Sequence, residues 1–255
     1  MTTLAPYLWI SSMLVIAGVA CGASGTEPQP GARDWNAERT RMVDTQLRAR
    51  DIESAQVLDA MLTVPRHLFV PEPQRARAYS DSPLPIGYDQ TISQPYIVAF
   101  MTQALDIAPG HRVLEVGTGS GYQAAVLSVL AQDVYTIEIL PPLAERARET
   151  LAALGYRNIQ MRTGNGYLGW PEHAPYDRIM VTAAPDDVPP ALLQQLKIGG
   201  LMAIPVGTVT QELRILRRTV TGTETLSTLP VRFVPMTNKP KEQAPRAQPS
   251  APLKR

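Results

Sequence analysis

Short apolar runs and helical periodicity alternate along the middle of the chain. An apolar run at residues 112–116 leads through a glycine-rich turn into a helical pattern at 122–131, and a second apolar run follows at 134–138. A strand, a helix and a strand in this order form a unit whose two strands are parallel. The pattern therefore predicts an α/β fold built around a parallel sheet.

The same alternation continues towards the C-terminus. It predicts helices at 143–154 and 190–196 and strands at 159–162, 178–182 and 201–205, the last after a turn at Gly199 and Gly200. Two further strands, at 212–218 and 230–235, have no helix between them, which is typical of an antiparallel hairpin. We therefore expect a Rossmann-like, doubly wound, mostly parallel seven-stranded sheet with helices on both faces and an antiparallel C-terminal hairpin.

Three helices are expected before the first strand of this sheet. Two follow from the apolar spacing at 35–50 and 56–63, and the third is expected to begin at Ser93, where a hydroxyl group and Pro95 both suit a helix start. Residues 64–90 are rich in proline, arginine and aspartate. A loop this long in a packed domain usually has a function, so we expect it to take part in binding.

Both ends of the chain differ from the central domain. Residues 8–20 are apolar and uncharged, too short for a comfortable membrane span but typical of an export signal, and small residues precede Cys21 as in a bacterial lipoprotein signal. The alternative is a start codon placed too early, with translation beginning near Met42. The expected organisation is a signal-like segment, a linker, the domain and a basic, proline-rich tail, at residues 1–21, 22–34, 35–237 and 238–255.

Composition excludes several classes of protein. The 255 residues include 24 lysines and arginines and 23 acidic residues, a net charge of +1, which argues against binding nucleic acid through massed phosphate contacts. A single cysteine rules out an internal disulfide, and three scattered histidines have no metal-ligand spacing. We expect no metal, no nucleic acid, and membrane contact only if Cys21 is lipidated.

A glycine-rich loop after the first strand of the sheet is the first candidate for chemistry. It reads Glu115-Val-Gly-Thr-Gly-Ser-Gly121, so its backbone can pass close to a ligand while amides at the helix start attract an anionic group. The dinucleotide fingerprint needs a small residue where Tyr122 stands, whereas the spacing suits S-adenosylmethionine. Glu138, at the end of the next strand, is expected to accept hydrogen bonds from the ribose hydroxyls.

A second tight turn, Gly164-Asn165-Gly166, follows the third strand of the sheet. Ligands of open α/β folds bind at this edge, which makes Asn165 a candidate contact for the adenine. Asparagine and glycine are also the residues that ordinary turns with a positive φ favour. The residues alone leave both interpretations open.

Seven longer sequence blocks are specific enough to suggest a family. They are VPRHLFVP (64–71), AYSDSPLPIG (78–87), QTISQP (90–95), LEVGTGSGY (114–122), APYDRIMVTAAP (174–185), LKIGGLMAIPVG (196–207) and VRFVPMT (231–237). In order and spacing the chain resembles the protein-L-isoaspartate O-methyltransferases, which are class I S-adenosylmethionine-dependent enzymes. The resemblance covers residues 38–237, and QTISQP and VTAAP are far more specific than the glycine loop.

The resemblance implies a role for each residue that matches a family motif. The residues expected to hold the cofactor are Glu115, Gly117, Thr118, Gly119, Gly121, Glu138, Asn165, Gly166 and Thr237. Those expected to meet the substrate are Thr91, Ile92, Ser93, Val181, Thr182, Ala183 and Ala184. Ser93 matches the family's active-site serine and is the candidate catalytic residue.

Two positions depart from the family's pattern. Asn165 stands where the family usually has an aspartate, so a hydrogen bond to the adenine would lack a charge and be weaker. In the segment Gly87-Tyr88-Asp89-Gln90-Thr91, Asp89 replaces a second glycine and brings a carboxylate close to the expected entry of an anionic substrate. The first departure is expected to weaken cofactor binding, and the second to slow turnover unless Asp89 points to water.

The implied reaction is methyl transfer from S-adenosylmethionine to the free carboxylate of L-isoaspartyl and D-aspartyl residues in damaged proteins and peptides. The carboxylate is already ionised at neutral pH, so alignment of the reacting groups matters more than a general base. The resemblance implies that the methyl ester then collapses to a succinimide, which starts repair. We expect a monomeric, cytoplasmic enzyme.

Several alternatives remain open. The altered Tyr88-Asp89 segment suggests a methyltransferase acting on another carboxylate, and the lipoprotein-like signal with Asn165 suggests a non-catalytic, exported binding module. A nicotinamide oxidoreductase is disfavoured by Tyr122. Export to the periplasm through Cys21 is the alternative to a cytoplasmic location.

Overall fold

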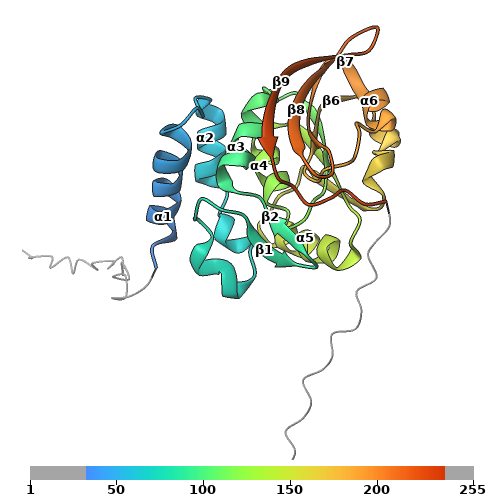
Figure 1. The fold of residues 1–255 in the computed structure, drawn as a ribbon. Coiled ribbons are helices and arrows are strands. Elements are labelled where there is room, and N and C mark those ends of the chain that lie inside the picture. The colour runs from blue at the N-terminus through green and yellow to red at the C-terminus, as the bar shows by residue number, and fades with distance from the viewer. Residues whose placement is uncertain (1–32, 239–255) are drawn as a thin grey trace, which may run out of the picture. The chain divides into compact units, whose positions relative to one another are not determined.

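A seven-stranded sheet forms the centre of the computed structural model, which describes residues 33–238 (Figure 1). The expected signal-like segment with Cys21, residues 22–32 of the linker and residues 239–255 of the tail lie outside the described residues. The strands of this sheet, in chain order, are β3 (Arg112–Val116), β4 (Asp133–Glu138), β5 (Ile159–Thr163), β6 (Tyr176–Val181), β7 (Leu196–Val206), β8 (Gln211–Arg218) and β9 (Thr223–Val231).

The topology of the sheet is doubly wound. Its order is β5-β4-β3-β6-β7-β8-β9, with parallel pairing from β5 to β7 and antiparallel pairing of β8 with both of its neighbours. The chain leaves the central strand β3 first towards β4 and later returns to β6 on its other side. Ligands bind at such a switch point, at the carboxyl ends of the strands. The predicted α/β class, sheet and C-terminal antiparallel pairing are confirmed.

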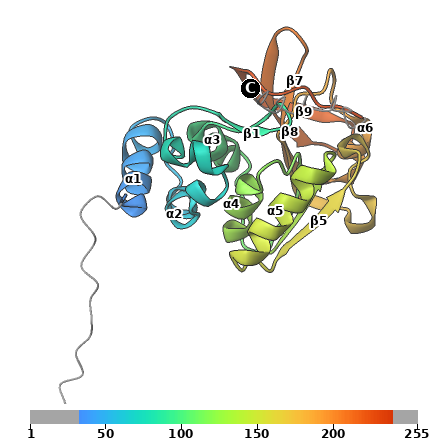
Figure 2. The ribbon, with the colours of Figure 1, turned by 90° about the horizontal axis from the view of Figure 1, so that it is seen from below.

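Helices cover both faces of the sheet. The α-helices are α1 (Trp35–Met42), α2 (Ala55–Thr63), α3 (Pro95–Ala104), α4 (Tyr122–Leu130), α5 (Pro141–Ala153) and α6 (Pro190–Gln195). Short helical turns are η1 (Val43–Arg48), of π type, and the 3₁₀ turns η2 (Arg66–Leu68), η3 (Glu72–Arg77), η4 (Gly166–Leu168) and η5 (Pro171–His173). Figure 2 shows α4 between α2 and α5.

Two apolar cores lie on opposite faces of the sheet because successive strand residues point to opposite sides. Val113 of β3 and Met180 of β6 face the core that includes α1 to α4. Their neighbours Leu114 and Val181 face the second core, to which Leu192 of α6 contributes. Each core thus takes alternate residues from the same strands, as the near-continuous apolar runs of buried parallel strands require.

The segment before the sheet is more ordered than the sequence predicts. The expected loop at 64–90 contains η2, η3 and β1 (Leu84–Gly87), and β1 pairs with β2 (Gln90–Ile92) in an antiparallel hairpin outside the main sheet. At the hairpin tip Tyr88 and Asp89 both have left-handed backbones, with φ of 56° and 55°. Two successive residues with positive φ match the two-residue turns that suit the twist of a hairpin.

Helix α3 begins at Pro95 and not at Ser93, which corrects the predicted boundary. Gln94 is the residue before the helix, with extended angles of φ −51° and ψ 138° and no capping hydrogen bond from its side chain. A residue that precedes proline is disfavoured in the helical region, so the helix cannot start earlier. Ser93 therefore lies in the short link between β2 and α3.

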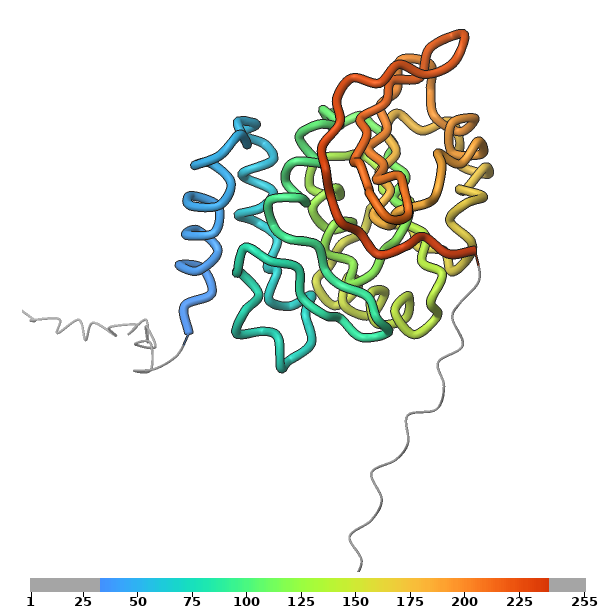
Figure 3. The backbone as a smooth tube through the Cα atoms, in the orientation of Figure 1, coloured from blue at the N-terminus to red at the C-terminus, as the bar shows by residue number. Residues whose placement is uncertain are grey.

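Two boundaries near the C-terminus also differ from the prediction. Strand β7 begins at Leu196, so Gly199 and Gly200 lie inside the strand and not in a turn before it. The last strand was expected at residues 230–235, but β9 spans Thr223–Val231 and leaves residues 232–235 outside the sheet. These residues instead leave the sheet edge and run back towards β6, where Pro235 forms a parallel bridge with Ala184 (Figure 3).

Neither a membrane-spanning helix nor a metal cluster is found within residues 33–238. None of the helices there combines the length and the apolar character needed to cross a bilayer. No group of three or more His, Cys, Asp or Glu side chains in that range is arranged to hold a metal ion.

Candidate active site

A cleft of about 1040 Å³, part of it open to solvent, lies at the carboxyl ends of β3, β4 and β6. Its walls come from the ends of these strands, the tip of the β1–β2 hairpin, η4 and the segment after β9. The lining residues are Tyr88, Asp89, Gln90, Thr91, Val116, Gly117, Gly119, Ile137, Glu138, Ile139, Leu140, Gly166, Thr182, Ala183, Val234, Pro235, Met236 and Thr237. The cleft is therefore at the switch point of the sheet, where the fold predicts a ligand.

The glycine loop forms one wall of this cleft. Gly117 and Gly119 line it with φ of 101° and 54°, values that side chains rarely allow. A Cβ atom on Gly117 would lie 2.3 Å from Oγ1 of Thr182, whose hydroxyl donates to the carbonyl of Gly117 over 2.6 Å. The loop and the end of β6 are thus in direct contact, which only a glycine permits.

Glu138 lines the cleft at the end of β4, and its contact with a ribose stays a prediction. It is 5% exposed, and its two carboxylate oxygens accept hydrogen bonds from the N–H groups of Gly119, at 2.8 Å, and Leu140, at 3.0 Å. Burial raises the pKa of Glu138, while these backbone N–H groups favour its charged form. The carboxylate is therefore held rigidly against the glycine loop.

Glu115 and Thr118 do not line the cleft, although the sequence predicts both as cofactor contacts. Glu115 is fully buried, and its carboxylate accepts a hydrogen bond of 2.5 Å from Oγ1 of Thr136. Oγ1 of Thr136 lies 2.6 Å from Oγ1 of Thr118, which joins the three side chains beneath the loop. Burial raises the pKa of Glu115 to about 8, with a smaller contribution from the charge of Glu138.

The second turn places Gly166 and not Asn165 on the cleft wall. Oδ1 of Asn165 accepts a hydrogen bond of 3.0 Å from the N–H of Tyr167 and so caps η4. A Cβ atom on Gly166 would lie 2.3 Å from Cγ1 of Val116, so this glycine is needed for the close approach of η4 to β3. Asn165 has the capping geometry of an ordinary turn residue.

The predicted substrate residues are only partly brought together on the cleft wall. Thr91, Thr182 and Ala183 line the cleft. Ile92, Val181 and Ala184 are buried in the protein, at 4%, 0% and 3% exposure. Their side chains support the cleft from behind, because neighbouring residues of an extended segment point in opposite directions.

Ser93 is half-buried and does not itself line the cleft, whose wall includes Thr91 two residues earlier. Its carbonyl accepts a hydrogen bond of 2.7 Å from Nη2 of Arg66. Within the described part of the chain its hydroxyl makes no hydrogen bond, so it stays available to a ligand.

Gly121 lies outside the cleft lining, where it precedes α4 with φ of 87°. Thr237 lines the cleft as predicted.

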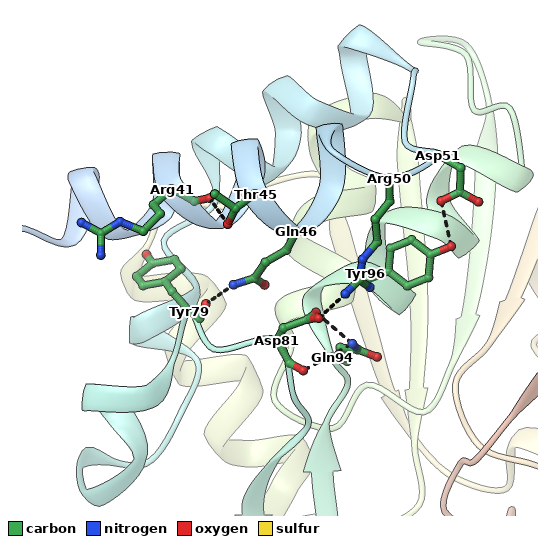
Figure 4. A network of polar contacts seen from close by, with 9 residues as sticks. All are labelled: Arg41, Thr45, Gln46, Arg50, Asp51, Tyr79, Asp81, Gln94 and Tyr96. Atoms are coloured by element: carbon green, nitrogen blue, oxygen red, sulfur yellow. Dashed lines mark hydrogen bonds and ion pairs between the residues drawn. The ribbon is translucent and has the colours of Figure 1, made fainter.

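A polar network next to Ser93 ties the N-terminal helices to this segment (Figure 4). Asp81 forms an ion pair with Arg50 and accepts a hydrogen bond of 2.8 Å from Nε2 of Gln94. The guanidinium of Arg50 lies 4.7 Å from the ring centre of Tyr96, whose hydroxyl donates to Asp51 over 2.8 Å. The link between β2 and α3 is therefore held by several charged and polar groups in addition to Arg66.

Other residues of the cleft wall escaped the sequence reasoning. The wall also includes Val234, Pro235 and Met236, which two backbone hydrogen bonds hold beside Ala184. The N–H of Ala184 donates to the carbonyl of Val234 over 2.9 Å, and the N–H of Met236 donates to the carbonyl of Ala184 over 2.7 Å. No sequence pattern predicts the pairing of Pro235 with Ala184, because the two segments lie about 50 residues apart in the chain. Ile139 and Leu140 carried a weak signal, because they directly follow Glu138.

Comparisons with known proteins agree with this geometry. A sequence model of the protein-L-isoaspartate(D-aspartate) O-methyltransferase family matches residues 37–241. The protein-L-isoaspartate O-methyltransferase of Synechococcus sp. (strain JA-2-3B'a(2-13)) is 56% identical over 225 residues, which cover 84% of this chain and 92% of that protein. The enzyme of the same name from Gloeobacter violaceus is 56% identical over 204 residues, covering 79% and 100%.

Solved structures give the same result. A protein-L-isoaspartate O-methyltransferase with 27% identity superposes with a TM-score of 0.72, covering 81% of this chain and 67% of that chain. A protein from Plasmodium falciparum, described as a putative enzyme of this kind in complex with S-adenosyl-L-homocysteine, has 25% identity and a TM-score of 0.68, with coverage of 79% and 99%. The chain belongs to the protein-L-isoaspartate(D-aspartate) O-methyltransferase family.

Proposed function

We propose that this protein methylates the free carboxylate of L-isoaspartyl and D-aspartyl residues in damaged proteins and peptides, with S-adenosylmethionine as methyl donor. The observation that carries the proposal is the cleft at the switch point, which is lined by Glu138 and the glycine loop together with Thr91, Thr182 and Ala183. Family membership supports both the donor and the acceptor.

The residues of the cleft fit this cofactor. Gly117 and Gly166 let the glycine loop and η4 pack closely against Thr182 and Val116 at the cleft wall, since a Cβ atom at either would collide with those side chains. The carboxylate of Glu138 is positioned to accept hydrogen bonds from ribose hydroxyls, and Thr237 and Gly119 complete the wall. When bound, the cofactor supplies an electrophilic methyl group.

The protein's own residues have to orient the acceptor and not to activate it. A peptide carboxylate is ionised at neutral pH and needs no general base. In the proposal the Ser93 hydroxyl donates a hydrogen bond to this carboxylate, and backbone N–H groups near Thr182 and Ala183 are further donors. The hairpin tip and residues 234–237 line the cleft from other sides and restrict water. After transfer, the neighbouring backbone amide nitrogen attacks the ester carbonyl and displaces methanol, and water then opens the resulting succinimide partly to normal aspartate.

The experiment offers the full-length protein an isoaspartyl peptide and the matching aspartyl peptide with labelled S-adenosylmethionine. We expect base-labile label in the isoaspartyl peptide only. If neither peptide is labelled but another carboxylate compound added with the labelled cofactor is, the enzyme has a different methyl acceptor. Calorimetry that detects no cofactor binding would favour a non-catalytic binding module.

We also propose that the enzyme is a cytoplasmic monomer, because its methyl donor is made in the cytoplasm. Residues 1–21 carry the competing export signal. Intact mass of the protein from fractionated cells tests this: the proposal expects soluble protein without lipid. Lipid on Cys21 in the membrane fraction would establish the exported form instead.

A further inference from the structure

Arg66 is a fully buried arginine between the substrate segment and the helix that follows the glycine loop. Its Nε donates to the carbonyl of Ala78 and its Nη2 to the carbonyl of Ser93, both over 2.7 Å. Its guanidinium carbon lies 4.9 Å from the ring centre of Tyr122, the first residue of α4. One side chain thus contacts both the Ser93 link and the start of the helix behind the cofactor loop.

The charge of Arg66 has no carboxylate partner among residues 33–238. Its remaining nitrogen, Nη1, is buried without a hydrogen-bond acceptor. Burial lowers the pKa of Arg66 to about 10, so the group is still charged at neutral pH. A buried, unpaired cation is unfavourable for folding, and buried charges are normally paired. The two carbonyl acceptors and the ring of Tyr122 favour the cation but carry no full negative charge, so the charge of Arg66 stays available to a nearby anion.

An anion bound at Ser93 would make use of this charge. The substrate's carboxylate carries one negative charge, and Nη2 of Arg66 already lies within hydrogen-bond distance of the Ser93 carbonyl. Charges separated from water interact more strongly than they do at the surface. Arg66 therefore both fixes the backbone that carries the Ser93 hydroxyl and creates a positive potential behind it.

We propose that Arg66 is a positioning residue that holds Ser93 in place for the isoaspartyl carboxylate and favours its negative charge, an inference that rests on the proposed function. Arg66 acts through Ser93 and does not itself touch the substrate. Its effect falls on peptide binding and turnover and not on the binding of the cofactor, since it contacts neither Glu138 nor the glycines of the cleft wall.

A double-mutant cycle tests whether Arg66 acts through Ser93. Arg66→Lys keeps the charge but loses the planar fork that reaches two carbonyls. We expect it to lower kcat/KM for an isoaspartyl peptide about tenfold, and by less than about twofold when Ser93→Ala is already present. Equal losses in both backgrounds would overturn the inference, because a purely structural role is additive.

Arg66→Met provides a second test that separates charge from packing, because it keeps an apolar stem of similar length. We expect the isoaspartyl peptide to bind at least about tenfold more weakly in the presence of S-adenosyl-L-homocysteine, with the affinity for S-adenosyl-L-homocysteine alone unchanged. Calorimetry measures both affinities without turnover. Weakened binding of both ligands, or unfolding of both Arg66 variants, would show a general structural role and overturn the inference.

The matched control is Arg178→Lys. Arg178 also donates to backbone carbonyls, those of Leu105, Asp106 and Asp177, but it lies in β6 away from the cleft lining. The Arg178→Lys substitution should lower thermal stability without changing peptide affinity, whether residue 93 is serine or alanine. Wild-type protein that never methylates isoaspartyl peptides would refute the proposed function itself, whereas active wild type with an additive cycle refutes only the inference about Arg66.

Discussion

Individual residues of the site differ mainly in what their polar atoms already contact. Ser93 has a free hydroxyl in the described part of the chain, whereas Asn165 uses its side chain to cap η4. Glu138 is held by two backbone N–H groups at the cleft, and Glu115 is buried beneath it. Residues of the same chemical type therefore have separate roles, set by their hydrogen-bond partners and burial.

Ser93→Ala separates a substrate contact from a helix cap. Because Gln94 and not Ser93 precedes α3, the variant should keep its stability and lose about 10- to 100-fold in kcat/KM, the loss expected for a hydrogen bond to a charged group. Steady-state kinetics and thermal melting measure the two effects. Ser54→Ala is the control, since Ser54 caps α2 through the N–H of Val57: it should lose about 1 kcal/mol of stability at unchanged turnover.

Glu115 should make the stability of the protein depend on pH. Its pKa is raised from 4.5 unfolded to about 8 folded, so its favourable contribution is complete below pH 4.5 and is lost as the pH rises towards 8. Glu115→Gln removes this loss. The free energy of unfolding of the variant, relative to wild type, should therefore rise between pH 5 and pH 8 by an amount on the order of a few kcal/mol.

Denaturant unfolding at both pH values measures this difference. The exposed Glu145→Gln is the control, and its effect should be similar at pH 5 and pH 8. A pH-independent difference between Glu115→Gln and wild type would contradict the buried, protonated state of Glu115.

At the scale of elements, the β1–β2 hairpin is a part of the site that lies outside the main sheet. Its tip places Tyr88 and Asp89 at the cleft with left-handed backbones. Only glycine adopts this conformation without strain, and other residues lose about 1–2 kcal/mol each. Asp89 also adds an exposed negative charge at the mouth of a cleft for which we propose an anionic substrate.

Asp89→Gly should therefore raise stability and lower the KM for an isoaspartyl peptide by about two- to fivefold at low salt. Asp89→Asn removes the charge but keeps a side chain, so it should lower KM equally with a smaller gain in stability. The difference in KM should disappear at high ionic strength, because salt screens exposed charges. A KM that is equal in all three proteins at low salt would show that the carboxylate does not face the entering substrate.

At the scale of the whole molecule, the cleft exists because distant segments meet at one edge of the sheet. β3, β4 and β6 end there because they are parallel, and Pro235 is brought back to Ala184 after the antiparallel strands. From the N-terminal side, Arg50 and Asp81 brace the link that carries Ser93. Three parts of the chain, before, within and after the sheet, thus contribute to one site.

Local patterns were sufficient to predict much of this arrangement. The strand at 112–116 and the glycine loop after it were predicted from apolar runs and glycine spacing, and both were found. Glu138 was predicted as a ribose contact from its place at the end of the second strand of a doubly wound sheet, and it lines the cleft. The start of α3 and the end of β9 were misplaced, because proline geometry at Gln94 and the pairing of Pro235 with Ala184 outweighed the apolar pattern.

The sequence by itself determined the order of strands and helices, the position of the glycine loop and the family, because periodicity and motif spacing are properties of neighbouring residues. Only the tertiary structure decided that Glu115 and Asn165 turn away from the cleft, that residues 234–236 enter its wall, and that Arg66 lies unpaired behind Ser93. These outcomes depend on which distant groups satisfy a buried polar atom, and no local pattern records such partners.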